Sequence, residues 1–347
     1  MQQYSTVPSR NLVMAARGML RAADPIKVIS SFGNNEEMPQ RRTDTIVFRR
    51  PRPIDAAGNG APQVTASDYL LQEGVTPAAR TIVYDDVQVT VQQYGVLMKI
   101  TAKAEALYED DIPADMQQLV GKHMGSIEEM ISYGVVRGGT NVVYSDGSAR
   151  SSVKTPMSLN KLRQAVRTLE SAHGSKTAKK LSAGPNFGTS SVEEGYLVFV
   201  HTDLSADVRN LAGFTKCTDY GSGATKVHER EIGAAEEFRF VTSPYFRPFL
   251  QAGANAAANA VLSNGAASTG SNASDVYPVM IVAADAWGQV AVKGMSSIDP
   301  TYLPAKMKTH ANPMGQFGYV GANFWKAAIR LNENWMVRYE VAASYLS

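Results

Sequence analysis

The sequence predicts an α+β fold built on one long helix and on a sheet that the chain completes only near its end. The helix is predicted over Ile112–Arg137, where apolar side chains recur at three- and four-residue spacing. The late sheet is predicted over Gly315–Glu340, where apolar and polar residues alternate with a period of two. With 347 residues, 44% of them hydrophobic and 19% charged, the chain can bury a large core.

Composition also limits the classes of function. The net charge is +2, from 34 basic and 32 acidic residues, so no whole-molecule field calls for nucleic acid as a surface ligand. The single cysteine, Cys217, excludes an internal disulfide and fits a reducing compartment. Residues 1–30 lack the apolar region of a signal peptide, and no run is apolar and long enough for a membrane span. We therefore expect no membrane anchor.

The first 33 residues are predicted to form a basic arm. Residues 11–23 have a helical composition, and Pro25 limits the helix. Arg10, Arg17 and Arg21 give the arm its local positive charge. These arginines are either a solvated helix face or groups that lie near a polyanion.

Residues 34–80 are predicted to form a long, partly β-stranded loop. They hold four prolines from Pro39 to Pro62 and the turn Gly58–Gly60, and a loop of this length is uncommon unless it has a function. The loop also holds a cluster of five arginines between residues 41 and 52, and arginine is favoured at interfaces between subunits. Phosphate binding is the alternative, but no glycine motif that could cradle a phosphate accompanies them. The five are Arg41, Arg42, Arg49, Arg50 and Arg52.

A β segment and the long helix come next. Residues 81–101 alternate between apolar and polar, and the phase changes near Gly95, which suggests a bulge or turn. The long helix has acids and a proline at its start, Asp110–Pro113, and a glycine pair after its end, beginning at Gly138. His123 lies on its apolar stripe and is expected to be a core histidine rather than a metal ligand.

The following region is predicted to mix helices and strands. A helix is expected over Asn160–His173 with Ser158 as its cap, and Tyr196–Val200 is an apolar run typical of a buried strand. His201 and Asp203 follow this strand and are the strongest candidates for chemistry. No catalytic, phosphate-binding or metal-binding motif accompanies them, so Asp203 is expected to cap the next helix. We expect no catalytic residue, no metal and no cofactor.

The terminal run is predicted to form two strands joined by a hairpin turn. Odd-numbered positions such as Trp325 and Trp335 form its apolar face, and even-numbered positions such as Lys326 form its wet face. Asn332–Asn334 interrupts the apolar series where a turn would fit.

Three sequence motifs and the order of the predicted parts carry a family resemblance. The motifs are Glu73–Pro77 before the β segment, Asp285–Gly288 after an apolar strand, and the whole Gly315–Glu340 run. In order and spacing they resemble the major capsid proteins of tailed bacteriophages with the HK-97-like fold. More narrowly, they resemble the family typified by the coliphage N-4 capsid protein. The resemblance spans nearly the full chain.

The resemblance implies a set of named parts. The arginines of the N-arm would face DNA, and those of the E-loop would contact a neighbouring subunit. Trp325, Trp335 and Tyr339 would pack the terminal strands against the spine helix in a core role. The parts would be the N-arm (1–33), the E-loop (34–80), the P-domain with the spine helix (81–150), the A-domain (151–295), and the A-domain return with the terminal strands of the P-domain (296–347).

The implied function is structural and not enzymatic. Hexamers and pentamers of the chain would form an icosahedral virion shell, assembled in the host bacterial cytoplasm. The implied partners are other copies, a separate scaffolding protein, a portal, an optional decoration protein, and packaged double-stranded DNA held by weak non-specific contact. One alternative is the shell of an encapsulin-like, non-viral compartment. A weaker alternative is a soluble α/β enzyme that uses His201 and Asp203.

One feature known in some relatives of this fold is not expected here. Those relatives join subunits through an isopeptide bond from an E-loop lysine, and this chain has no lysine between Lys27 and Lys99. We therefore expect no covalent crosslink from the loop.

Overall fold

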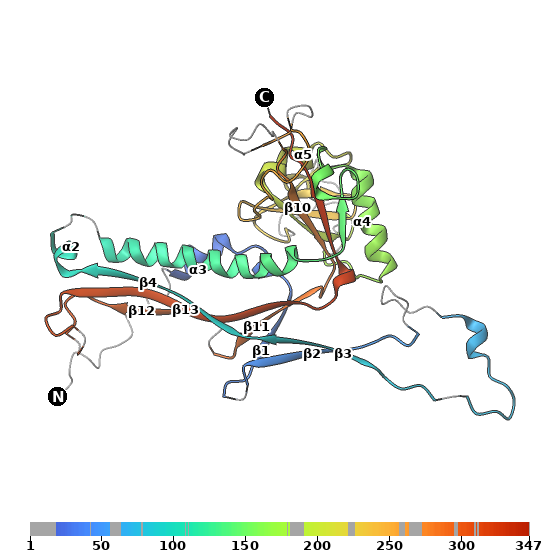
Figure 1. Cartoon of the computed structure of the whole chain (residues 1–347), viewed down its shortest axis with the longest axis horizontal. Helices are drawn as coiled ribbons and strands as arrows, with labels where there is room; N and C mark the ends of the chain where they lie inside the picture. The colour runs from blue at the N-terminus through green and yellow to red at the C-terminus, as the bar shows by residue number, and fades with distance from the viewer. Residues whose placement is uncertain are drawn as a thin grey trace. The chain divides into compact units, whose positions relative to one another are not determined.

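The computed structural model describes two compact units of the chain (Figure 1). The first is formed by the described parts of Met1–Ile46, Val89–Val135 and Gly288–Ile329, and the second by those of Val47–Gln88, Val136–Trp287 and Arg330–Ser347. The residues described are 19–346, apart from 42, 56–63, 78, 108, 110, 179, 181–190, 221–225, 257–260, 264–272, 295–297, 309 and 311.

A five-stranded sheet and the long helix make up the first unit. Its strands are β1 (Asn34–Met38), β4 (Gln92–Thr101), β11 (Trp287–Val292), β12 (Asp299–Leu303) and β13 (Phe317–Arg330). The short helix α2 (Ala102–Leu107) follows β4, and α3 (Ile112–Arg137) then runs along β4 and β13 (Figure 1). The predicted bounds of this long helix are confirmed, and Asp111 accepts the N–H of Ala114 at its first turn (3.3 Å).

The contact between α3 and β13 fixes which face of the strand is buried. Met116, Val120 and Met124 of the helix form a core with the even-numbered residues Val320, Ala322 and Phe324. Lys326 shares this buried face and is only 7% exposed, whereas Trp325 is half-buried. The predicted phase of this strand is therefore wrong. The buried face is made largely of small residues, and a counter-charge on α3 neutralises its lysine.

His123 is also placed differently from the prediction. It lies on α3 but is exposed, so it is not a core histidine.

Two glycines of α3 let residues 19–23, which are helical, lie against it. A Cβ on Gly121 would stand 2.4 Å from the carbonyl oxygen of Met19, and one on Gly125 would stand 2.9 Å from that of Ala23. Only a residue without a side chain permits so close an approach of two backbones. Met19 and Ala23 are fully buried there. The arm segment before Pro25 is therefore helical as far as it is described, and residues 11–18 lie outside the described part.

Two consecutive glutamates of α3 hold the last part of the arm, residues 27–30. Glu129 is fully buried, and its carboxylate accepts the backbone N–H groups of Val28, Ile29 and Ser30 at 2.8–3.2 Å. It also accepts the hydroxyl of Ser30. These donors replace the hydrogen bonds to water that the carboxylate loses on burial.

The preceding residue, Glu128, joins two lysines. Its carboxylate lies 2.7 Å from the ammonium of Lys27 and 2.6 Å from that of Lys326 on β13. Burial would raise the pKa of Glu128, but the charges of Lys326 and Lys27 outweigh it and lower the pKa. The buried lysine of β13 is thus explained by an acid nearly 200 residues earlier in the chain.

The second unit contains a seven-stranded sheet with two helices, α4 (Leu159–Ser171) and α5 (Ser205–Arg209). The predicted helix and the predicted buried strand are both confirmed, although Ser158 makes no side-chain cap. The sheet order is β5-β14-β10-β6-β9-β8-β7. Its strands are β5 (Val142–Tyr144), β6 (Tyr196–His201), β7 (Thr215–Lys216), β8 (Glu231–Ala235), β9 (Phe238–Ser243), β10 (Tyr277–Val282) and β14 (Met336–Val341).

The predicted terminal hairpin is wrong, because β13 and β14 belong to different sheets. The side chain of Asn332 accepts the N–H of Asn334 (3.2 Å) and starts a 3-10 turn, η9 (Glu333–Trp335). After this turn β14 pairs antiparallel with β10 and parallel with β5. Strand alternation shows that a segment is half-buried, but it does not identify the partner strand.

The aromatic residues of the terminal run consequently separate. Tyr339 is fully buried beside α4, and its hydroxyl accepts the N–H of Ser158 (3.2 Å). The indole N–H of Trp335 donates to the carbonyl of Ala172 at the end of α4 (3.0 Å). Trp335 and Tyr339 therefore do not pack on the spine helix as predicted, and Trp325 lies on β13 in the first sheet.

A two-stranded ribbon, β2 (Thr45–Pro51) with β3 (Tyr84–Thr90), flanks the long connection that includes η4 (Ala66–Tyr69). We call residues 45–90 the ribbon loop. Up to Val91 the odd-numbered side chains are the less exposed ones, and from Tyr94 onward the even-numbered ones are. The change of face predicted near Gly95 therefore falls at residues 92–93.

We expect Glu129→Ala to lower the free energy of unfolding of the subunit by roughly 3–5 kcal/mol, because three buried N–H groups lose their acceptor. Glu129→Gln should cost less, since one carbonyl oxygen remains. Urea denaturation of unassembled subunits measures both. The exposed Glu36 on β1 provides the control, Glu36→Ala. Equal stability of Glu129→Ala and the control would contradict the role of Glu129.

The depressed pKa of Glu128 predicts an acid-labile contribution to stability. Its folded pKa lies below the ordinary value of 4.5, so its contribution is complete above that pH and is lost as the pH falls through the folded pKa. Urea unfolding at several pH values below 4.5 should show a shallower loss of stability in Glu128→Gln than in the parent chain. Parallel pH profiles for the two proteins would refute this assignment.

Candidate functional site

His201 and Asp203, the candidates for chemistry, form hydrogen bonds that stabilise the local fold. Nδ1 of His201 accepts the N–H of Asp203 (3.1 Å), and Oδ2 of Asp203 accepts the hydroxyl of Tyr277 (2.8 Å). Burial lowers the pKa of His201. His201, and not Asp203 as predicted, therefore caps the short helix η6 (Thr202–Leu204). The pair joins the end of β6 to β10.

The described residues offer no cluster suited to a metal ion and no helix suited to crossing a membrane. Within them there is no cluster of three or more histidine, cysteine or acidic side chains suited to a metal ion. No helix among them has the length and apolar character that crossing a bilayer requires.

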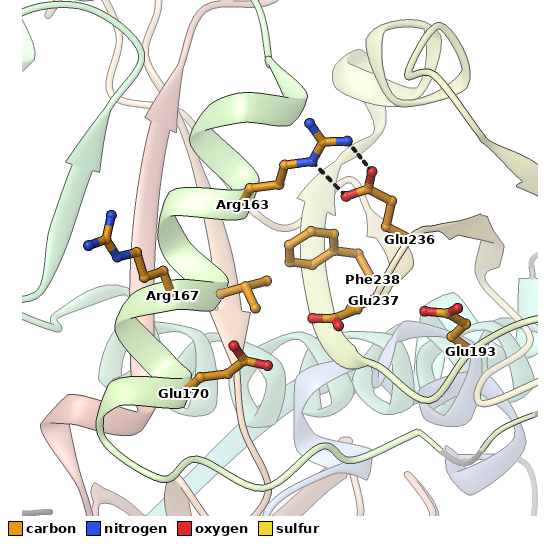
Figure 2. A pocket seen from close by; sticks show the side chains of 8 residues that line it. Arg163, Arg167, Glu170, Glu193, Glu236, Glu237 and Phe238 are labelled. Carbon is orange, nitrogen blue, oxygen red and sulfur yellow. Dashed lines mark hydrogen bonds and ion pairs between the residues drawn. The ribbon is translucent and has the colours of Figure 1, made fainter.

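A recess of about 480 Å³ lies between α4 and the β8–β9 turn of the second unit (Figure 2). Val166 and Phe238 are its apolar lining residues. Arg163 binds Glu236 through two hydrogen bonds, Nε–Oε2 at 3.1 Å and Nη2–Oε1 at 2.5 Å, as the dashed lines of Figure 2 show. The hydrogen bond from Arg163 lowers the pKa of Glu236. This paired carboxylate is kept ionised and unprotonated, which makes it a poor general acid.

The ribbon loop is the part of the described chain where large apolar side chains face solvent most densely. Among its described residues the buried apolar side chain is Phe48, at 9% exposure. A soluble protein rarely leaves many adjoining apolar groups uncovered, so this loop has the composition of an interaction surface. The exposed residues are Val47, Ile54, Val64, Tyr69, Leu70, Leu71, Val75, Ile82, Val83 and Tyr84.

Two of the arginines predicted for an interface form ion pairs across the ribbon. Arg49 donates to Asp86 through two bonds of 2.8 and 2.9 Å, and Arg52 donates to Asp85 at 2.5 Å. These hydrogen bonds lower the pKa of both aspartates. The sequence contains a signal for this pairing: two adjacent aspartates lie on one predicted strand, and the arginines lie on the other. The sequence analysis assigned these arginines to an interface and did not predict the pairing.

The remaining predicted site residues are dispersed. Arg50 lies 3.7 Å from Asp85 and over the ring of Trp335. Arg41 is exposed on the connection between β1 and β2, and Arg21 is exposed on the helical segment 19–23. Arg10, Arg17 and Arg42 lie outside the described residues.

No family model matches the sequence. A search of curated proteins also finds no match.

Solved capsid structures of phages, in contrast, match the fold over most of its length. The capsid of Ralstonia phage GP4 matches with a TM-score of 0.63 and 10% identity, covering 90% of this chain and 87% of that chain. A chain of the cyanophage Pam1 capsid asymmetric unit matches with a TM-score of 0.58 and 13% identity, covering 99% and 96%. The capsid of cyanophage P-SCSP1u matches with a TM-score of 0.54 and 9% identity, covering 90% and 87%.

At these identities the likeness concerns the fold. The narrower resemblance to the coliphage N-4 family stays a prediction. The predicted α+β, HK-97-like architecture is confirmed: the chain has the fold of tailed-phage capsid proteins.

Proposed function

We propose that this chain is the major capsid protein of a tailed bacteriophage and that its copies assemble into the shell of the virion. The observation that carries the proposal is the match of nearly the whole chain to nearly the whole length of solved capsid subunits. Because both lengths agree, the likeness extends beyond a shared supersecondary motif.

The ribbon loop supports self-association on physical grounds. Its exposed apolar side chains need a cover, and repeated copies of the same chain supply one. A closed shell requires heterologous contacts repeated around symmetry axes, and a long loop that reaches a neighbour provides such a contact. We propose that residues 34–80 act as the E-loop in this sense.

The other named parts belong to the same proposal. Residues 1–33 would form the arm, and residues 81–150 would form the P-domain with α3 as its spine helix. Residues 151–295 would form the A-domain, and residues 296–347 would form its return and the terminal strands of the P-domain. Hexamers and pentamers of the chain would enclose double-stranded DNA, with Arg10, Arg17 and Arg21 facing it. A net charge of +2 suits a wall that touches DNA weakly. A scaffolding protein, a portal and a decoration protein would be further partners in the host cytoplasm.

The two alternatives receive less support. A shell of the encapsulin type would share the fold, but the similar structures named above are phage capsids. An enzyme that uses His201 and Asp203 would need reactive groups, and both side chains are engaged in bonds that hold β6 to its neighbours.

Electron microscopy of the purified chain tests the proposal. We expect closed shells, tubes or capsomers, because exposed apolar loop surface drives association. On denaturing gels the particles should give one band at the monomer mass, because the loop has no lysine for a covalent link. A small compact oligomer would refute the proposed function. A ladder of covalently linked bands would refute only the prediction that the loop forms no crosslink.

The arginines of the ribbon permit a matched comparison. If Arg49 contacts a neighbouring subunit, Arg49→Ala should lower the yield of shells, whereas Asp86→Asn should leave it nearly unchanged. If Arg49 acts only within the ribbon, both variants lose the same ion pair and should behave alike. Particle yield by sedimentation, with subunit stability as the control, separates the two outcomes.

A further inference from the structure

A polar recess of about 260 Å³ lies on the first unit beside β1, the edge strand of the five-stranded sheet. Residues of β1 and β11 line it, together with Ser30, Glu128 of α3 and Lys326 of β13. Pockets that hold drug-sized ligands measure roughly 300–1,000 Å³. The recess is smaller than these, so it suits one small group rather than a large cofactor.

A buried amide oxygen at this recess lacks a hydrogen-bond donor. Gln289 of β11 lines the recess and is only 3% exposed. Its Nε2 donates to the carbonyls of Ser30 (3.3 Å) and Phe32 (2.5 Å), which fixes the amide with Oε1 directed away from them. Within the part of the chain that the structure describes, no group donates to this Oε1. Buried acceptors are rarely left without a donor, so this oxygen indicates a ligand N–H or a water in the recess.

The register of β1 and β11 places one carboxylate on the same face as this oxygen. Asn35 is paired with Gln289, and paired residues of neighbouring strands share a face of the sheet. Two residues further on, Glu37 is on that face again, whereas Glu36 is on the opposite one. Both glutamates are exposed, and neither forms an ion pair with another described residue.

The other charges at the recess balance one another. Glu128 joins Lys27 (2.7 Å) to Lys326 (2.6 Å), so these three groups together carry one excess positive charge. The buried carboxylate of Glu129, the next residue, cancels that excess. The charge that remains is the negative charge of the two glutamates on β1. The recess therefore favours a positively charged ligand, although Lys326 is part of its wall.

We propose that this recess binds one organic cation that carries N–H donors, namely a guanidinium or a primary ammonium group. Such a group can pair with the carboxylate of Glu37 and donate a hydrogen bond to Oε1 of Gln289. A metal ion suits the recess less well, because the described residues form no cluster of three or more metal-ligating side chains. The cation comes either from a small molecule or from a basic side chain of another chain. The site lies within one subunit, so the inference does not depend on the proposed function.

Titration calorimetry of unassembled subunits tests the site, with argininamide as the probe. We expect one argininamide to bind per subunit at low salt. Citrullinamide has nearly the same size but no charge, so it forms no ion pair. It should bind at least about tenfold more weakly.

The two adjacent glutamates of β1 supply matched variants. Glu37→Gln should weaken the binding of argininamide at least about tenfold, because the paired carboxylate is lost. Glu36→Gln removes the same charge from the opposite face and should weaken binding less than about threefold, since an exposed charge at a distance contributes little. Both side chains are exposed, so neither variant should change the unfolding transition of the subunit.

Gln289→Leu removes the amide oxygen and should also weaken binding at least about tenfold. This variant also loses the hydrogen bonds to Ser30 and Phe32, so its unfolding transition must be measured first. If it does not fold, the two glutamate variants decide the question.

Three results would overturn the inference. The first is no binding of argininamide, because the recess would then hold water only. The second is equal binding of citrullinamide, and the third is an equal loss of binding in the two glutamate variants.

Assembled shells distinguish the two sources of the cation. Shells that bind argininamide as the subunits do have an open site, which identifies a small molecule as the ligand. Shells that no longer bind it have the site filled by a basic side chain of another chain. If no shells form, the proposed function fails, and the titration of subunits still decides whether the site exists.

Discussion

The first unit depends on two adjacent carboxylates of α3. Successive residues of a helix point about 100° apart, so neighbouring acids can hold different segments. Glu129 binds the backbone of the last part of the arm, and Glu128 joins Lys27 to Lys326 on β13. Buried charges of this kind are tolerated only when every partner is present, and removing one leaves the others unpaired. The helix, the arm segment and the terminal strand are therefore fixed as one body.

The ribbon loop is built in the opposite way. Its two strands are joined by exposed ion pairs between arginines and aspartates, which contribute little stability on their own. Its large apolar side chains mostly face solvent. The buried carboxylates of the first unit and the exposed ion pairs of the ribbon loop are therefore two different ways of using charge. The proposed assembly accounts for the contrast, because a second copy of the chain would cover the apolar side chains of the loop.

The sequence predicted those elements whose signals are local. The bounds of α3 follow from its acidic start, its apolar period and the glycines after its end, and the buried strand at Tyr196 follows from an unbroken apolar run. The errors in the terminal run concern distant partners. Lys326 is buried because Glu128 neutralises it, and no pattern within β13 reveals that acid. The burial of Tyr339 was expected, but its neighbour is α4 rather than α3.

The pairing of the two strands in the terminal run shows why the predicted hairpin was wrong. β13 pairs with β4 from the middle of the chain, and β14 pairs with β10 and β5, so one continuous segment supplies a strand to each sheet. The interruption at Asn332 is a change of sheet and not a reversal within one. Each sheet gains an interior strand only when this segment is in place. Such long-range pairing has a large cost in loop-closure entropy. It also makes the folding of both units depend on the same segment.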